Sequence, residues 1–263
     1  MTDAELLPIR DIQPDIHRVW ARDEVSGETD WKNVLAHYAN HYDETLTLTV
    51  FDPDSGEEQV ITSNRIHPFF ARPAADLMPV LSVRYDPNEN ENGEWIEAQD
   101  LTKGQRLYSE DGTWDIVSDL KIETIPLKAF NLTVDDFHTY FIAQSDNDTP
   151  LWVHNDCLTK EVKEKWPELV GVLRDATKQK GNFGIGSSTN EKSEILGNAW
   201  VGANYKVASD GKTLISNNGL RQYRPPSKKP NSPYSKTGIQ ANFERREHPN
   251  GPWIHNGHLD IEE

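Results

Sequence analysis

The sequence predicts two domains: an all-β domain over residues 1–155, followed by an α+β domain over residues 156–263 whose helices precede an antiparallel sheet. Three observations predict this division. Short segments of the first part alternate apolar and polar positions, residues 158–179 carry apolar side chains at helical spacing, and the charge changes sign near residue 155.

The strands expected in the first part are short and punctuated by turns. Residues 44–52 and 58–63 alternate apolar and polar positions around the segment PDSGE, a pattern that predicts a hairpin. Further strands are expected over residues 95–98, 106–109, 115–125, 128–134, 139–143 and 151–154.

The second part begins with the helical stripe over residues 158–179. A Gly-rich loop at residues 181–188 and a second helix are expected next, with Ser188 and Glu191 at the spacing of a capping box. Short strands follow to the end of the chain, among them YKVAS, TLISN, LRQYRP, IQANFERR and HLDI.

Charge separates the two parts more sharply than hydropathy does. Residues 1–155 hold 11 Lys and Arg against 30 Asp and Glu, whereas residues 178–246 hold 12 basic against 4 acidic side chains. A basic region of this kind favours a nucleic-acid partner. No run of about 18 apolar residues predicts a membrane-spanning helix. The single cysteine, Cys157, excludes an internal disulfide and a multi-cysteine zinc site.

Five blocks in the first part resemble the Hint (hedgehog/intein) fold, and in particular the pretoxin Hint domains of bacterial polymorphic toxins. ITSNRIHPFFA at residues 61–71 resembles the histidine block, and LWVHN at residues 151–155 the terminal block. The other three are AELLPIRDI at 4–12, which resembles the early strand, WIEAQDLTKGQRLYSEDG at 95–112 and FNLTVDDFHTYFIAQ at 130–144.

The resemblance implies self-cleavage of the chain. His67 would polarise the first scissile peptide, His154 would assist cyclisation, and the amide of Asn155 would attack its own carbonyl and cut the chain before Asp156. His138 is a further candidate proton carrier. No Cys or Ser opens a first strand, which we expect to be missing, and Asp156 cannot accept an acyl group, so cleavage is expected rather than splicing.

A Hint module followed by about 100 residues with a basic stretch is similar to the contact-dependent-inhibition and Rhs toxins, which carry variable nuclease tips. This resemblance implies an antibacterial endonuclease used in bacterial competition. It would be delivered as part of a larger secreted toxin and act in the cytoplasm of the target cell. A cognate immunity protein, acidic enough to cover the basic surface, is the expected partner.

Two catalytic routes are open for the second domain. In the favoured route, which suits DNA, Glu191 and Asp210 bind Mg²⁺ or Zn²⁺ and Lys229 lies beside the attacking water. The alternative is a metal-free ribonuclease acting on tRNA or rRNA, with His258 exchanging protons beside Glu244 and Arg246. Alternation in the last two strands places Glu244, His258 and Asp260 on one polar sheet face.

A basic segment interleaved with an aromatic residue predicts phosphate binding. Arg221, Arg224 and Lys228 would contact phosphate oxygens while Tyr223 offers a stacking surface. Two further alternatives remain open at this point: a nucleic-acid-binding module without catalysis, and an autoprocessing element whose tail is only cargo.

Overall fold

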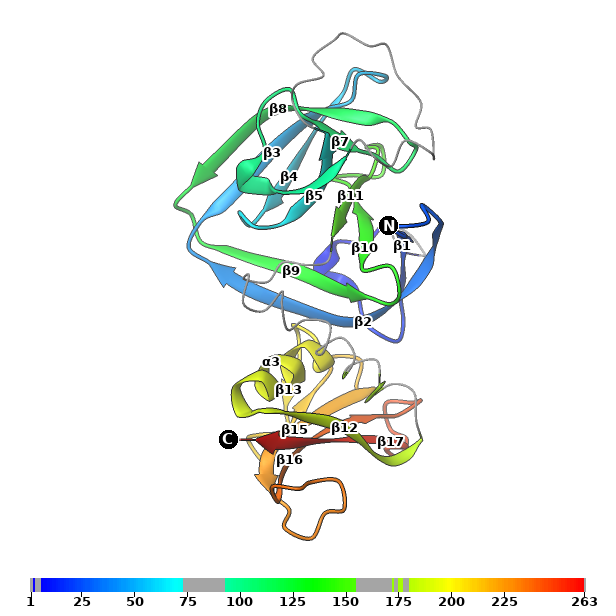
Figure 1. Cartoon of the computed structure of the whole chain (residues 1–263), viewed down its shortest axis with the longest axis vertical. Helices are drawn as coiled ribbons and strands as arrows, with labels where there is room; N and C mark the ends of the chain where they lie inside the picture. Colours follow the sequence, from blue (N-terminus) through cyan, green and yellow to red (C-terminus); the bar gives the residue numbers. More distant parts are fainter. Residues whose placement is uncertain are drawn as a thin grey trace. The chain divides into compact units, whose positions relative to one another are not determined.

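The computed structural model describes residues 2, 6–72, 93–154, 172, 175–176 and 180–262. The chain forms two compact units (Figure 1). The N-terminal unit comprises residues 1–9, 17–33 and 40–160, and the C-terminal unit comprises residues 10–16, 34–39 and 161–263. The C-terminal unit therefore takes in two short segments from the first part of the sequence.

The N-terminal unit is all-β, as predicted. One sheet has the order β1-β2-β9, and a second has the order β10-β11-β5-β7-β8-β3-β4 with β6 paired to β5. The strands are β1 (Arg18–Arg22), β2 (Thr29–Tyr42), β3 (Thr45–Phe51), β4 (Glu58–Ser63), β5 (Pro68–Arg72), β6 (Glu94–Glu97), β7 (Arg106–Tyr108), β8 (Trp114–Glu123), β9 (Leu127–Val134), β10 (Thr139–Ile142) and β11 (Leu151–His154). Residues 34–39 of β2 belong to the C-terminal unit.

The predicted hairpin of β3 and β4 is confirmed, with Val50 opposite Gln59. Every second residue of each strand is buried, so the alternation in the sequence reflects a sheet with one covered face. An aromatic cluster stabilises the other end of the same sheet. Tyr108, Trp114, Phe141 and Trp152 are buried in it, and three partly buried aromatic residues pack around them: Trp20, Phe70 and Trp95.

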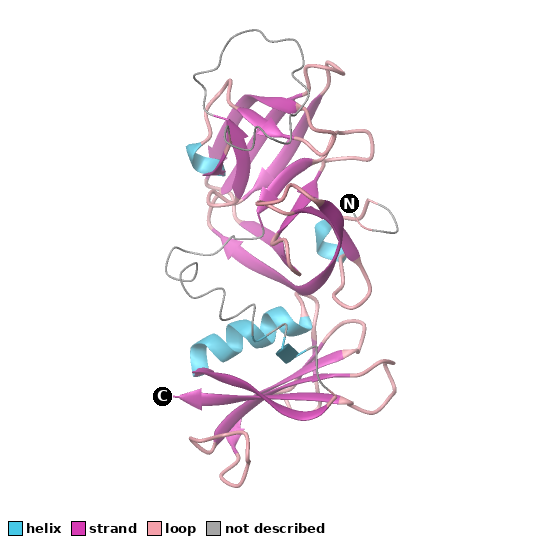
Figure 2. Cartoon of the chain, turned by 45° about the vertical axis from the view of Figure 1, so that its right-hand side comes forward, coloured by secondary structure: helices cyan, strands magenta, loops and turns pink. Residues whose placement is uncertain are grey.

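The C-terminal unit is a six-stranded sheet in the order β12-β17-β16-β15-β14-β13, with helix α3 along one face (Figure 2). The pairs from β13 to β17 are antiparallel, but β12 runs parallel to β17. The elements are β12 (Gly181–Thr189), α3 (Asn190–Val201), β13 (Lys206–Val207), β14 (Leu214–Ile215), β15 (Arg221–Lys228), β16 (Ile239–Arg245) and β17 (His255–Glu262).

Helix α3 packs closely on the sheet because Gly197 lies against Tyr223 of β15. A Cβ atom at position 197 would come within 2.3 Å of the Tyr223 ring, so this position requires glycine. Ser193 of the same helix face is within 3.2 Å of the Tyr223 hydroxyl. Tyr223 is thus a core residue of the unit, together with Trp200 and Phe243.

Three local predictions were wrong. The expected Gly-rich loop at residues 181–188 is strand β12, in which Phe183 and Ile185 are buried at alternate positions. The N-cap of α3 is Thr189, one residue beyond the expected Ser188. The Thr189 hydroxyl accepts a hydrogen bond from the Lys192 amide. Within 4–12, the described residues contain the 3-10 turn Ile9–Asp11 instead of an early strand. The helical stripe at 158–179 lies almost entirely outside the described residues.

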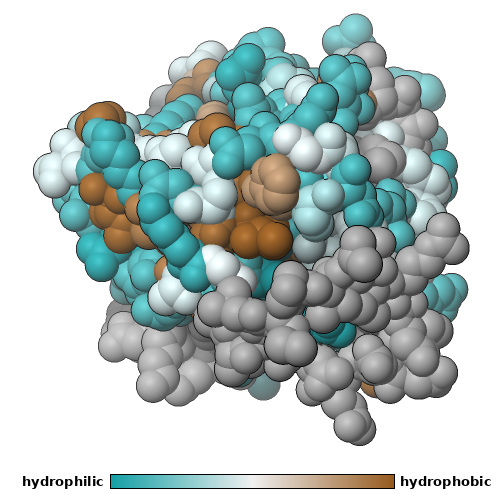
Figure 3. Space-filling view, turned by 90° about the horizontal axis from the view of Figure 1, so that it is seen from above, coloured by the Kyte–Doolittle hydropathy of each residue, from teal (hydrophilic) through white to brown (hydrophobic). Residues whose placement is uncertain are grey.

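In the described part of the chain, no helix is long and apolar enough to span a membrane. Figure 3 views one face of the molecule, where hydrophilic residues predominate and hydrophobic side chains form small separate patches.

Candidate functional site

Two of the expected histidines in the N-terminal unit lie at the ends of paired strands. His67 immediately precedes β5 and His154 ends β11, and these two strands pair through Phe69 and Val153. His67 is buried and meets the edge of the Phe69 ring, with 5.4 Å between the centroids. Burial, and then the charge of His154, lower the pKa of His67 to about 3, so His67 is neutral at physiological pH.

An acidic residue that the sequence did not single out completes this histidine site. Glu24 lies between strands β1 and β2, and its Oε1 is 2.8 Å from Nε2 of His154. Its other oxygen accepts a hydrogen bond from the indole of Trp95 at 2.9 Å. Burial opposes ionisation of Glu24, but the bond and charge of His154 outweigh it and lower the pKa of the carboxyl group.

Glu24 therefore fixes the orientation of His154 in the way that a carboxylate orients a catalytic histidine. His138 stands in a tight turn just before β10, with a φ of 57°, and its charge also acts on Glu24. Asn155, the expected cleavage residue, lies outside the described residues.

The C-terminal unit presents a polar sheet face in which side chains from four strands meet. Strand register places Asn242 opposite His258 and next to Arg224, and Glu244 opposite Asn256 and next to Gln222. On the parallel side, Asn182 of β12 is level with Asn256. The predicted common face of Glu244, His258 and Asp260 thus exists, because all three are at alternate positions of neighbouring strands.

His258 is held by amide groups on both ring nitrogens. Its Nδ1 is 2.7 Å from Nε2 of Gln240 and 3.0 Å from Nδ2 of Asn242, and its Nε2 is 3.2 Å from Oδ1 of Asn182. Two amide donors at Nδ1 and an acceptor at Nε2 select the neutral imidazole with its proton on Nε2. Burial, and next the charge of Arg224, lower the pKa of His258 in agreement with this.

Glu244 and Arg224 form an ion pair at the same face. Nη2 of Arg224 donates to Oε1 of Glu244 at 2.7 Å, and the Gln222 amide donates to Oε2. The Arg224 side chain is 40% exposed whereas that of Glu244 is 7% exposed, so the guanidinium forms the outer side of the pair. Nε of Arg224 and Oε1 of Gln240 have no hydrogen-bond partner among the described residues.

Asp260 holds the loop that covers one end of this face. It accepts hydrogen bonds from Ser235 (2.7 Å), from the Lys236 amide (3.0 Å) and from Thr237 (2.8 Å). Burial raises the pKa of the Asp260 carboxyl group, but these hydrogen bonds outweigh burial and lower the pKa to about 2. The loop brings Tyr234 onto His258, with the rings stacked 4.4 Å apart. Asp260 is therefore an anchor for Tyr234.

The predicted phosphate-binding segment was half wrong. It is strand β15, and alternation turns Arg221 and Tyr223 to the helix side, where they are 2% and 1% exposed. Neither can contact a phosphate or stack on a base. Arg224 lies on the polar face, and Lys228 is exposed at the end of the strand. Arg246, expected beside His258, instead donates to the Gly219 carbonyl and lies over Trp253.

The three residues of the expected metal route occupy surface positions. Glu191 is exposed in the first turn of α3, and Lys229 is exposed beyond β15. Asp210 accepts from the amides of Lys212 and Thr213 and from the Thr213 hydroxyl, bonds that lower its pKa to about 2. Within the described ranges, no three His, Cys, Asp or Glu side chains form a group that could hold a metal ion.

A comparison with protein families finds a match over the first part of the chain. A family model described as "Pretoxin HINT domain" matches residues 1–78 and 75–156. No curated protein matches the chain in sequence. A bacterial intein-like domain from Clostridium thermocellum, solved in solution, is 29% identical, covers 59% of this chain and 92% of its own, and gives a TM-score of 0.45.

Two inteins are similar over the same share of this chain, 59%. The DnaB intein from Synechocystis sp. PCC 6803 is 16% identical over 89% of its own chain, with a TM-score of 0.38. The DnaX mini intein from Spirulina platensis is 19% identical over 93% of its chain, with a TM-score of 0.40. Because the family model spans more than half of the sequence, the chain belongs to the pretoxin HINT domain family, with a β-rich C-terminal region beyond the matched residues.

Proposed function

We propose that this chain is a toxin precursor whose HINT domain cuts after Asn155, and whose C-terminal unit is a ribonuclease that works without a metal ion. Membership of the pretoxin family supports the first half of the proposal. One observation carries the second half: an acid, a base and a phosphate-binding cation, all from neighbouring strands, share one sheet face.

The spacing of this face suits a phosphodiester. Glu244 is opposite Asn256, so His258, two positions further along β17, is its diagonal neighbour. Residues at diagonal positions of paired strands are about 7–8 Å apart. Two side chains at that separation can contact one phosphate group from opposite sides. Arg224 is ion-paired to Glu244 and has an unpartnered Nε, which can donate to a phosphate oxygen.

In the proposed reaction, the Glu244 carboxylate takes the proton of the ribose 2′-hydroxyl and the 2′-oxygen attacks the phosphorus. His258 gives a proton to the departing 5′-oxygen as the P–O5′ bond breaks. The products are a 2′,3′-cyclic phosphate and a free 5′-hydroxyl, and Arg224 stabilises the charge on the phosphorane.

His258 must first gain a proton, and the site allows this. A bound phosphate offsets the positive charge of Arg224, one of the two causes that lower the pKa of His258. Protonated Nδ1 then needs an acceptor in place of the Gln240 and Asn242 amide donors. A half-turn of both amides removes the two donors, and the Gln240 amide then supplies Oε1, which is buried without a partner.

The metal-dependent route through Glu191, Asp210 and Lys229 is the second candidate, and it would serve DNA. An acidic immunity protein and delivery within a larger toxin of the contact-dependent-inhibition or Rhs kind also remain part of the proposal. They rest on the excess of 12 basic over 4 acidic residues in the 178–246 segment and on the pretoxin family.

The test is a cleavage assay with the full chain. Labelled tRNA, rRNA and duplex DNA are incubated with the protein in EDTA, in Mg²⁺ and in Zn²⁺. We expect RNA cleavage in EDTA that is lost in His258→Asn and in Arg224→Gln. His248→Asn, at an exposed position of the same unit, is the matched control.

Cleavage of DNA only, and only with a divalent ion, would contradict the proposal and favour the metal route. Binding of nucleic acid without cleavage under every condition would point to a binding module. Asp210→Ala separates the two routes, because it should leave the metal-free activity unchanged.

A further inference from the structure

The C-terminal unit is assembled from three separate stretches of the chain. Two of them, residues 10–16 and 34–39, lie within the matched HINT region, while the third, residues 161–263, lies beyond the cleavage position. Scission after Asn155 would therefore place parts of one compact unit on different fragments.

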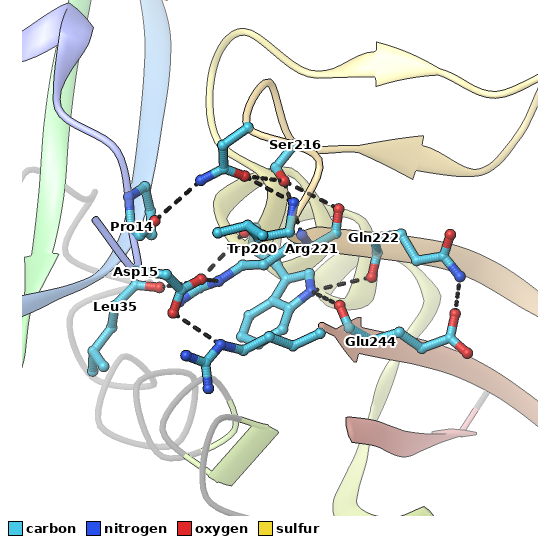
Figure 4. A network of polar contacts seen from close by, with 11 residues as sticks. Pro14, Asp15, Leu35, Trp200, Ser216, Arg221, Gln222 and Glu244 are labelled. Carbon is cyan, nitrogen blue, oxygen red and sulfur yellow. Dashed lines mark hydrogen bonds and ion pairs between the residues drawn. The ribbon is translucent and has the colours of Figure 1, made fainter. Parts of the chain in front are cut away.

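A buried ion pair joins the first stretch to the third (Figure 4). Arg221 of β15 donates from Nε and from Nη2 to the two carboxylate oxygens of Asp15, the Nη2 bond being 2.9 Å long. The side chains are 2% and 9% exposed. Arg245 adds a second cation 3.1 Å from Asp15. The positive charges outweigh burial and lower the pKa of Asp15, so the carboxyl group is ionised at neutral pH.

The second stretch contacts the same guanidinium. Nη1 of Arg221 donates to the carbonyl of Leu35 in β2, and the guanidinium carbon lies 4.1 Å from the centre of the Trp200 ring. Without residues 10–16 and 34–39, Arg221 would lose its carboxylate and its Leu35 acceptor. Of the acceptors given above and the Trp200 carbonyl at 3.4 Å, the Trp200 carbonyl would then remain.

Weaker contacts extend this docking surface. Nδ2 of Asn218 donates to the Pro14 carbonyl at 3.3 Å, and Nδ2 of Asn204 donates to the Arg10 carbonyl at 3.4 Å. Asp15 has a φ of 68°, a left-handed conformation that a residue other than glycine adopts when its surroundings fix it.

The docked stretches lie on the side of the sheet opposite the polar face. Arg221 pairs with Arg245 across β15 and β16, and both side chains reach Asp15 on the helix side of the sheet. Gln222 follows Arg221 in β15, and Glu244 precedes Arg245 in β16. Both side chains therefore point to the opposite side of the sheet. Holding Asp15 at Arg221 is therefore compatible with a substrate bound at the polar face.

We infer that the two fragments produced by scission after Asn155 stay bound to each other, with residues 10–16 and 34–39 docked on the Arg221 surface of the C-terminal fragment. Scission alone does not release the C-terminal fragment. Its release requires a later step that withdraws Asp15. This inference concerns assembly and is independent of the proposed ribonuclease activity.

The test uses a chain that cannot cut itself. A site for a specific protease is inserted between positions 155 and 156 of the Asn155→Ala chain, and size-exclusion chromatography with mass analysis follows the cut. We expect both fragments in one peak at micromolar concentration. The dissociation constant should rise about a hundredfold or more in Asp15→Asn, because an unpaired buried Arg221 remains.

Asp11→Asn is the matched control, since Asp11 lies in the same stretch, is exposed and should leave the dissociation constant unchanged. Asn218→Ala removes only a peripheral hydrogen bond and should raise the dissociation constant by a smaller factor. This variant still tests the inference if Asp15→Asn does not fold. Separate elution of the wild-type fragments would overturn the inference. So would a dissociation constant that is equal in Asp15→Asn, Asn218→Ala and the wild type.

Discussion

The ion pair of Asp15 and Arg221 gives a quantitative prediction for the intact chain. In Arg221→Met, the apolar part of the side chain stays on Trp200 while the Asp15 carboxylate loses its closest cation. In Asp15→Asn, the guanidinium is left buried at 2% exposure. Removing one partner of a buried pair costs about 3–5 kcal/mol, whereas neutralising both costs much less.

A double-mutant cycle measures this coupling. We expect each single substitution to destabilise the C-terminal unit by about 3–5 kcal/mol, and the double variant Asp15→Asn/Arg221→Met to lose no more than either single one. Because the chain has two units, hydrogen exchange of peptides from α3 and β15 is the appropriate measurement, since it reports on this unit alone.

The coupling should also depend on pH in a defined direction. Asp15 has a folded-state pKa below its ordinary 3.8, so its contribution is complete above the unfolded value and is lost as the pH falls through the lowered pKa. The cycle should thus give the full coupling at pH 7 and a much smaller one below the folded pKa. Additive single effects at pH 7 would refute the reasoning.

Three further predictions concern the two units. Burial raises the pKa of Asp115 to about 7 from 3.8, so the folded state resists its ionisation and stability falls as the pH rises through this range. Asp115→Asn should therefore stabilise the N-terminal unit at pH 8 by up to about 4 kcal/mol in denaturant unfolding, at about 1.4 kcal/mol per pKa unit, whereas Asp43→Asn at an exposed position of the same domain should not. Intact-mass analysis should show a fragment beginning at Asp156 that disappears in Asn155→Ala; a wild-type chain that stays whole on prolonged incubation would contradict scission. Glu24→Gln should slow that scission less than His154→Ala, for which about 10²-fold or more is expected of a lost proton carrier; equal rates in all three chains would exclude both residues.

Much of the fold follows from alternation along the sequence. The β3–β4 hairpin and the common face of Glu244 and His258 were predicted correctly, because side chains at alternate positions of a strand lie on the same face of the sheet. Strand β12 was missed, since its glycines favoured a loop while only Phe183 and Ile185 carried the strand signal.

The errors at the site have a different physical cause. Basic residues next to prolines suggested a phosphate-binding loop, but a partner 206 residues away neutralises Arg221. No local pattern reveals that Asp15 is this partner. Glu24 was missed for the same reason, because only the packing of the β1–β2 turn in the folded unit brings it to His154, 130 positions along the chain.

The chemical nature of the cut ends tests the proposed mechanism most directly. A short RNA cut by the full chain in EDTA is analysed by mass spectrometry, beside the same oligonucleotide with a single 2′-deoxyribose at the cleaved position. Attack by the 2′-oxygen predicts a 2′,3′-cyclic phosphate and a 5′-hydroxyl end, with no cut at the deoxy position. A 5′-phosphate end, or equal cleavage of the deoxy substrate, would contradict the assignment of Glu244, Arg224 and His258.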